Sequence, residues 1–93
     1  MLYNLVMFKI WAKLHKKEKI VGNIVFERNE KFDREKFFSY LTEICQKLDI
    51  VVPVVMTSHI DHFVSFNNCR FMQRDFIDRV GFSKLTLENV PLK

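Results

Sequence analysis

The sequence predicts an α+β fold in which an antiparallel sheet of about four strands carries one main amphipathic helix on one face. Residues 4–14 and 20–26 alternate their side chains between two faces with period two, as strands do. Residues 34–48 carry an apolar stripe with helical spacing, and residues 84–90 form a last short strand. The expected order is strand, strand, helix, strand, short helices, strand. We expect one domain over residues 1–93, because no repeat or linker interrupts the chain.

The first two strands are expected to form a hairpin. Val6, Phe8, Ile10, Ala12 and Leu14 share one face of the first strand. A helix with Leu2, Leu5, Val6 and Ile10 on one stripe is the competing interpretation of this segment. The strand is favoured because a second β-type run follows, at a distance that suits a hairpin loop. That loop lacks an Asn-Gly pair, so its turn type stays open.

The helix over residues 34–48 is expected to begin at Asp33, whose carboxylate can accept hydrogen bonds from the first free amides. Phe32 and Phe37 have the spacing of a hydrophobic staple across this start. The apolar stripe holds Phe37, Leu41, Ile44 and Leu48, and Phe38 and Cys45 widen it.

Two further strands are expected at residues 50–57 and 84–90. The first is a β-branched run interrupted by Pro53, which cannot donate to a sheet ladder and so favours a strand start or an edge. Either of these two strands is a candidate free edge that pairs with a second copy or accepts a peptide.

The segment from Ser58 to Phe82 is expected to hold two short helices. Ser58 starts the first, which has His59, Phe63 and Phe66 on one face, and Asn67 and Asn68 end it. The second spans about residues 72–80, with Asp75 and Arg79 paired four positions apart and Gly81 at its end.

Composition favours a packed domain in a reducing compartment. The chain is 48% hydrophobic with ten Phe and only two Gly and two Pro, unlike a disordered chain. The cysteines, Cys45 and Cys69, number only two, which suits reduced thiols in the cytoplasm. No good signal peptide or membrane-length apolar run is present in the sequence. We therefore expect a soluble cytoplasmic protein.

Charge is concentrated near the N-terminus. The formal net charge is +4, and residues 1–36 hold nine Lys and Arg against five acids, whereas residues 37–93 hold six of each. The basic hairpin tip makes nucleic acid a candidate partner, with phosphates bound by lysines and a base stacked on the indole. A solvated turn is the plainer explanation. The candidate residues are Trp11, Lys13, His15, Lys16, Lys17 and Lys19.

His59, His62 and Cys69 are the candidate metal ligands, because zinc binds imidazole and thiolate and two histidines three apart can share a helix face. Asp61 lies between them, but the sequence offers no clear fourth ligand. We expect no cofactor, with zinc as the exception this cluster allows. Cys69 beside a histidine is also the one candidate nucleophile. No orienting residue or oxyanion pocket accompanies it, so we expect a non-catalytic protein.

Aromatic residues crowd into the region around residues 63–76. Ten Phe exceed what a small core needs, and exposed aromatics with arginine are typical of protein interfaces. The competing explanation is that these rings complete the core. The sequence therefore ranks a self-associating protein-interaction module first, a nucleic-acid-binding domain second and a metal or thiol site third. The interface candidates are Phe63, Phe66, Arg70, Phe71 and Arg74.

Overall fold

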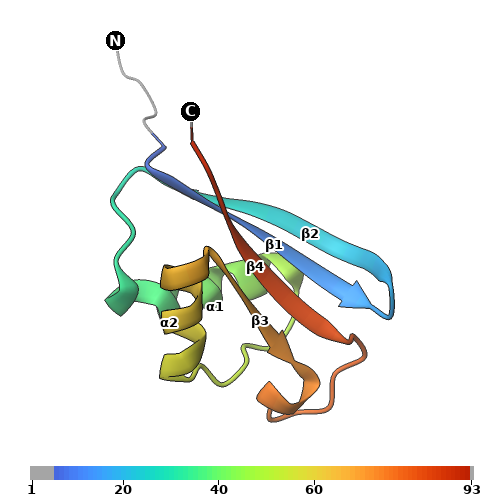
Figure 1. Cartoon of the computed structure of the whole chain (residues 1–93). Helices are drawn as coiled ribbons and strands as arrows, with labels where there is room; N and C mark the ends of the chain where they lie inside the picture. The colour runs from blue at the N-terminus through green and yellow to red at the C-terminus, as the bar shows by residue number, and fades with distance from the viewer. Residues whose placement is uncertain (1–5, 93) are drawn as a thin grey trace.

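The computed structural model describes residues 6–92 and confirms the α+β class. A four-stranded antiparallel sheet is covered on one face by two helices, and no helix of residues 6–92 lies on its other face (Figure 1). Its elements in chain order are β1 (Phe8–Lys16), β2 (Lys19–Arg28), the 3-10 turn η1 (Arg34–Lys36), α1 (Phe37–Leu48), α2 (Thr57–Phe66), β3 (Asn68–Met72), the 3-10 turn η2 (Gln73–Asp75) and β4 (Lys84–Val90).

Strands β1 and β2 form the expected hairpin. Their turn is only two residues long, Lys17 and Glu18, and Lys17 takes a positive φ of 58°. Pairing runs from Phe8 opposite Arg28 to Lys16 opposite Lys19, with a bulge at Val21. The predicted apolar face of β1 is buried from Phe8 to Leu14. The first residues of the predicted strand, Asn4 and Leu5, lie outside the described part of the chain.

The main helix begins as predicted. Asp33 Oδ1 accepts a 2.9 Å hydrogen bond from the Glu35 N–H, which caps η1, and α1 continues from it. The rings of Phe32 and Phe37 lie edge to face with 6.4 Å between their centroids. The helix ends at Asp49, which adopts the left-handed conformation with φ of 59°. The fully buried side chains of α1, which pack on the sheet, include Phe37, Leu41, Ile44 and Cys45.

The strand predicted at residues 50–57 is wrong, because this segment crosses irregularly from α1 to α2. Pro53 is buried in the crossing, where its missing N–H costs no ladder hydrogen bond. The Val54 N–H donates to the Asp75 carbonyl oxygen at 2.8 Å. The loop is rich in β-branched residues because its side chains pack on the core. Ile50, Val52 and Val55 are all partly buried there. The third strand of the sheet is β3 instead.

The first short helix is present as α2, and Asn67 ends it in the left-handed conformation. The second, predicted over residues 72–80, is wrong, because only η2 forms and Gly81 ends no helix. The Asp75 carboxylate turns back to accept a 2.7 Å hydrogen bond from the Met72 N–H instead of reaching Arg79. Phe76 follows with extended backbone angles. Its ring is buried, and the ring centroid lies 5.2 Å from that of Phe82.

The sheet order is β2-β1-β4-β3, so the last strand in the sequence lies in the centre. The expectation that residues 50–57 or 84–90 supply an edge is therefore wrong, and the two edges are β2 and β3. Strand β4 is central because β1 and β3 both pair with it. No helix within residues 6–92 is long and apolar enough to cross a membrane.

Candidate functional site

The uncovered side of the sheet, called the open face here, is set by the alternation of its strands. Phe8, Ile10, Ala12 and Leu14 point into the core, so the residues between them point the other way. Register then aligns Lys13 with Thr86 and Arg70, and His15 with Lys84 and Met72, across three strands. The open face comprises Lys9, Trp11, Lys13 and His15 of β1, Ile20, Asn23, Val25 and Glu27 of β2, Lys84, Thr86 and Glu88 of β4, and Asn68, Arg70 and Met72 of β3.

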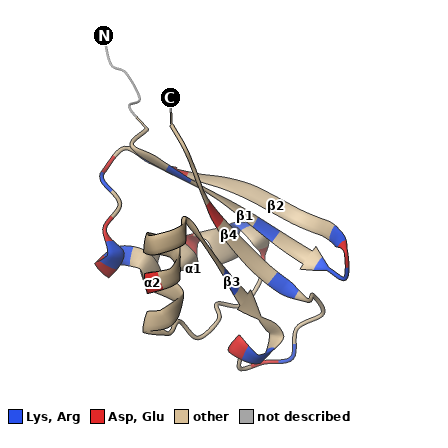
Figure 2. Cartoon of the chain, viewed as in Figure 1, with Lys and Arg blue, Asp and Glu red and all other residues tan. Residues whose placement is uncertain are grey.

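The whole net charge of the chain lies on this face and at the adjacent hairpin tip, residues 16–19. Together they hold seven Lys and Arg against three Glu, while the rest of the chain holds eight basic and eight acidic residues. Figure 2 shows the basic positions along β1 and β4 and at the end of the hairpin. The surplus of +4 is therefore segregated, and the remainder of the molecule is neutral.

Trp11 is the centre of a polar cluster on the open face. The Lys13 Nζ lies 4.2 Å from the centroid of its ring and 3.4 Å from Glu88 Oε1. The indole N–H donates to Asn23 Oδ1 at 3.3 Å. Lys13 is thus partly neutralised, as is Lys9 by Glu27 at 3.3 Å.

Arg70 and Lys84 complete the positive charge of the face without such neutralisation. Neither side chain forms an ion pair with any acid of the described chain. Arg70 is exposed and Lys84 is half-buried beside His15. A ligand can therefore bind these two cations without first breaking an ion pair with a carboxylate.

His15 lies half-buried between the lysines of this face. Its Nε2 lies 3.0 Å from the Thr86 Oγ1. Burial, followed by the nearby charges of Lys84 and Lys13, lowers the pKa of His15 below its usual value. The imidazole is therefore neutral at pH 7, and an anion bound next to it would raise that pKa.

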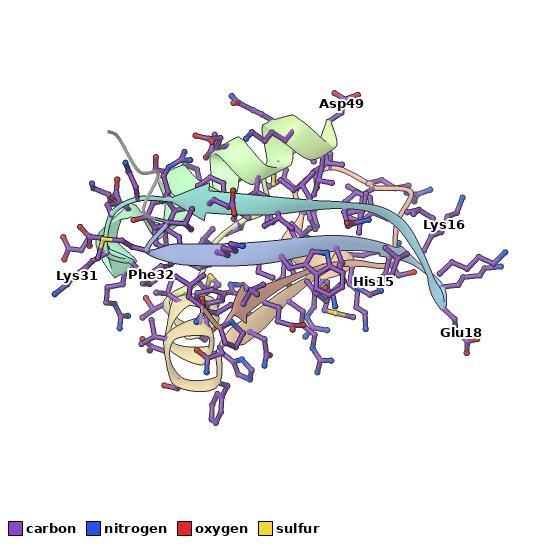
Figure 3. All side chains as sticks on the ribbon, turned by 90° about the horizontal axis from the view of Figure 1, so that it is seen from above. His15, Lys16, Glu18, Lys31, Phe32 and Asp49 are labelled. Carbon is purple, nitrogen blue, oxygen red and sulfur yellow. The ribbon has the colours of Figure 1, made fainter. Side chains whose placement is uncertain are left out.

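The hairpin tip extends the face beyond the sheet. In Figure 3 Lys16 and Glu18 project from the end of the hairpin, at the opposite end of the sheet from Lys31 and Phe32. The tip is anchored, because the Lys17 N–H donates to Ser83 Oγ and the Ser83 N–H donates to the His15 carbonyl oxygen, each at 2.7 Å. Of the six residues singled out from the sequence, Trp11, Lys13 and His15 therefore lie on the open face, and Lys16, Lys17 and Lys19 lie at the hairpin tip next to it.

The proposed aromatic interface is not one surface. Phe63 and Phe71 are 4% and 0% exposed and belong to the core, as do Phe76 and Phe82. Phe66 is 64% exposed at the end of α2, whereas Arg70 points to the open face. Arg74 is exposed in η2. Four of the clustered rings complete the core, and Phe66 is the one left in solvent.

The three candidate metal ligands are engaged elsewhere. His59 Nδ1 accepts a hydrogen bond from the Met56 N–H at 2.9 Å, and its Nε2 lies 3.5 Å from Asp75 Oδ2. His62 Nδ1 lies 2.7 Å from the Asn68 carbonyl oxygen. Cys69 is buried, and burial raises the pKa of its thiol to about 12. No three His, Cys, Asp or Glu side chains within residues 6–92 are grouped as metal ligands would be.

A groove of about 740 Å³ lies over β3 and is lined from both faces of the sheet. Its lining includes Lys13, His15, Arg70, Lys84 and Thr86. Sequence reasoning singled out Lys13 and His15 for nucleic acid and Arg70 for a protein interface, but it missed Lys84 and Thr86. The alternation of residues 84–90 was a usable signal for Lys84 and Thr86, whereas Arg70 depended on a strand that the sequence did not predict.

No protein-family model matches the sequence, and no curated protein or solved structure is similar enough to match it.

Proposed function

We propose that the protein binds single-stranded nucleic acid on the open face and the hairpin tip. One observation carries this proposal: the entire net charge of the chain is divided between the sheet face that no described helix covers, which also holds the chain's only tryptophan, and the adjacent hairpin tip. Proteins that bind single strands without reading a duplex combine a basic surface with aromatic rings on which bases stack.

The arrangement of cations fits a flexible polyanion. Lys13, Arg70 and Lys84 come from three adjacent strands, which lie about 4.8 Å apart, so the cations are distributed across the sheet. Lys16, Lys17 and Lys19 continue the positive surface at the tip. A single strand can follow this path from β3 to the tip while its bases face the sheet.

Stacking on Trp11 requires Lys13 to leave the ring. Exposed cation–π contacts contribute about 0.5–1 kcal/mol and exposed ion pairs a similar amount. Base stacking on an aromatic ring contributes about 1–3 kcal/mol per base, which offsets a loss of up to about 2 kcal/mol from the two contacts of Lys13. Lys13 is then released to contact a phosphate. We place this activity in the reducing cytoplasm, because Cys45 and Cys69 are buried free thiols.

The test is fluorescence anisotropy with a labelled single-stranded oligonucleotide of about 15 nucleotides. If about four phosphates are contacted, affinity falls roughly 50-fold between 50 and 200 mM salt. The Arg70→Glu/Lys84→Glu variant is expected to weaken binding at least about tenfold and to reduce the salt slope by about 1.4. Quenching of the single tryptophan on binding would support stacking on Trp11.

The matched control is Lys47→Glu/Arg79→Glu, which makes the same charge change at exposed positions outside the open face. It is expected to bind within about twofold of the parent, since long-range charge is screened at physiological salt. If both variants weakened oligonucleotide binding equally, net charge alone would explain the loss of affinity. That result would contradict a defined binding site. Binding to anionic vesicles without binding to the oligonucleotide would also contradict the proposal.

A further inference from the structure

The two edges of the sheet are protected very differently. At β3, the Asn67 carbonyl oxygen accepts from the Asn89 N–H, so the backbone groups of Asn68, Arg70 and Met72 point outward. His62 contacts the Asn68 carbonyl oxygen, and Asp75 accepts from the Met72 N–H, each at 2.7 Å. Side chains thus occupy part of this short edge.

Strand β2 has no comparable protection. It is ten residues long, and no side chain of the described chain hydrogen-bonds its backbone between Lys19 and Phe26. Residues 20–26 are uncharged and contain no proline. Ile20, Val21 and Val25 are each about half exposed, at 50%, 54% and 52%. Among residues 6–92, only the bulge at Val21 and the charges at the strand ends blunt this edge.

We infer that β2 pairs antiparallel with β2 of a second copy of this chain, joining two sheets into one of eight strands. The long, uncharged edge supplies the backbone hydrogen bonds, and the half-exposed apolar side chains pack across the junction.

Charge selects this orientation. The turn end of β2 is basic, because Lys16, Lys17 and Lys19 lie there against Glu18, whereas the other end is neutral, with Glu27 and Glu30 balanced by Arg28 and Lys31. Antiparallel pairing places the basic end of each copy beside the neutral end of its partner, whereas parallel pairing would place the two lysine clusters together. Opposite charges across strands stabilise pairing and like charges destabilise it.

The helical side of the junction is also compatible with a second copy. Helix α1 lies under β2, where Leu48 Cδ2 is 3.7 Å from the site of a Cβ on Gly22. Glu43 is ion-paired with Arg28 of β2, and Lys47 Nζ lies 3.7 Å from the same carboxylate. The helix therefore presents an acid and a base together at this edge, so no unpaired charge is buried as the copies approach.

Pairing would also enlarge the proposed nucleic-acid surface. Trp11 lies on β1, directly beside β2, so three strand spacings, or about 14 Å, would separate the two β1 strands that carry the indoles. This consequence alone rests on the proposed function. The pairing itself is argued from the edge and is measured without nucleic acid.

Sedimentation velocity of nuclease-treated protein, over concentrations from low to high micromolar, tests the pairing. The parent is expected to move from monomer to dimer as concentration rises. Val25→Lys places like charges near the junction and is expected to raise the dissociation constant on the order of tenfold. Val25 is half exposed on the open face, so the variant should fold, which far-UV circular dichroism verifies.

The matched control is Val64→Lys, which introduces the same side chain at a 48% exposed position on α2. It is expected to leave the dissociation constant unchanged. Hydrogen exchange supplies an independent readout, because amides of residues 20–26 gain protection in the dimer and lose it in the Val25→Lys variant. A parent that stays monomeric throughout, or a dimer weakened by Val64→Lys rather than by Val25→Lys, would overturn the inference.

Discussion

Cys45 on α1 and Cys69 on β3 show how burial decides the chemistry of a single residue. Both side chains are nearly inaccessible, at 0% and 4% exposure, and burial raises the pKa of each thiol from 9.0 to about 12. A thiolate is the reactive form of cysteine, so neither residue is primed as a nucleophile at neutral pH. Both behave as small apolar core residues.

These thiols are expected to make stability fall at alkaline pH. Above pH 9 the unfolded chain loses thiol protons that the folded chain keeps until about pH 12, so the folded state binds more protons. Each thiol then reduces the free energy of unfolding by up to about 1.4 kcal/mol per pH unit within that window. Urea unfolding under reducing conditions from pH 8 to 11 measures the slope.

A Cys45→Ala/Cys69→Ala variant is the control for other groups that titrate there, including Tyr40, whose pKa burial also raises. Its baseline stability is lower, but its alkaline slope should be shallower than that of the parent. Equal slopes would show that the thiols do not keep their protons in the folded state.

The candidate site was partly predictable at the level of residues. Strand alternation and the basic tip place Trp11, Lys13 and His15 near one another from the sequence alone. Arg70 and Lys84 join them only through pairing with strands distant in sequence, and a single sequence does not specify that register. The cluster of His59, His62 and Cys69 is close in sequence, but Cys69 turns into the core.

At the level of elements, local signals predicted structure well where the element is stabilised locally. The signals that predict the hairpin and α1 are the period-two alternation of the strands and the N-cap and hydrophobic staple of the helix. Each of these signals lies within a few neighbouring residues. The run at residues 50–57 has the composition of a strand because its apolar side chains reach the core from a loop. Strand β3 has only five residues, which is too short for alternation to be distinctive.

The cap of the main helix gives a prediction at this scale. Asp33→Ala removes the carboxylate that accepts from the Glu35 N–H, and it should lower the free energy of unfolding by about 1 kcal/mol. Chemical denaturation measures the change. Asp78→Ala, at an exposed position with no hydrogen bond or ion pair in the described structure, should change stability by less than about 0.5 kcal/mol. Equal losses would mean that the carboxylate at Asp33 does not act as a cap.

At the level of the whole molecule, the sheet is completed by β4, which comes last in sequence order among its strands. Strand β4 lies between β1 and β3, and it supplies Leu85 and Leu87, which are 0% and 1% exposed. Pairing of β1 with β4 links residues about seventy positions apart, as Lys13 opposite Thr86 illustrates. The core and the open face therefore form together, because both depend on the same central strand.

Truncation tests this dependence. A chain that ends at Ser83 lacks β4, so β1 loses one of its two partners and β3 loses its only one. We expect no cooperative thermal unfolding and poor dispersion of amide resonances, since the two buried leucines and both ladders are lost together. Removing only residues 91–93, which follow β4, should leave a cooperative transition close to that of the full chain. A truncated chain that still unfolds cooperatively would show that the hairpin and helices form a stable unit alone, with the open face assembled on it afterwards.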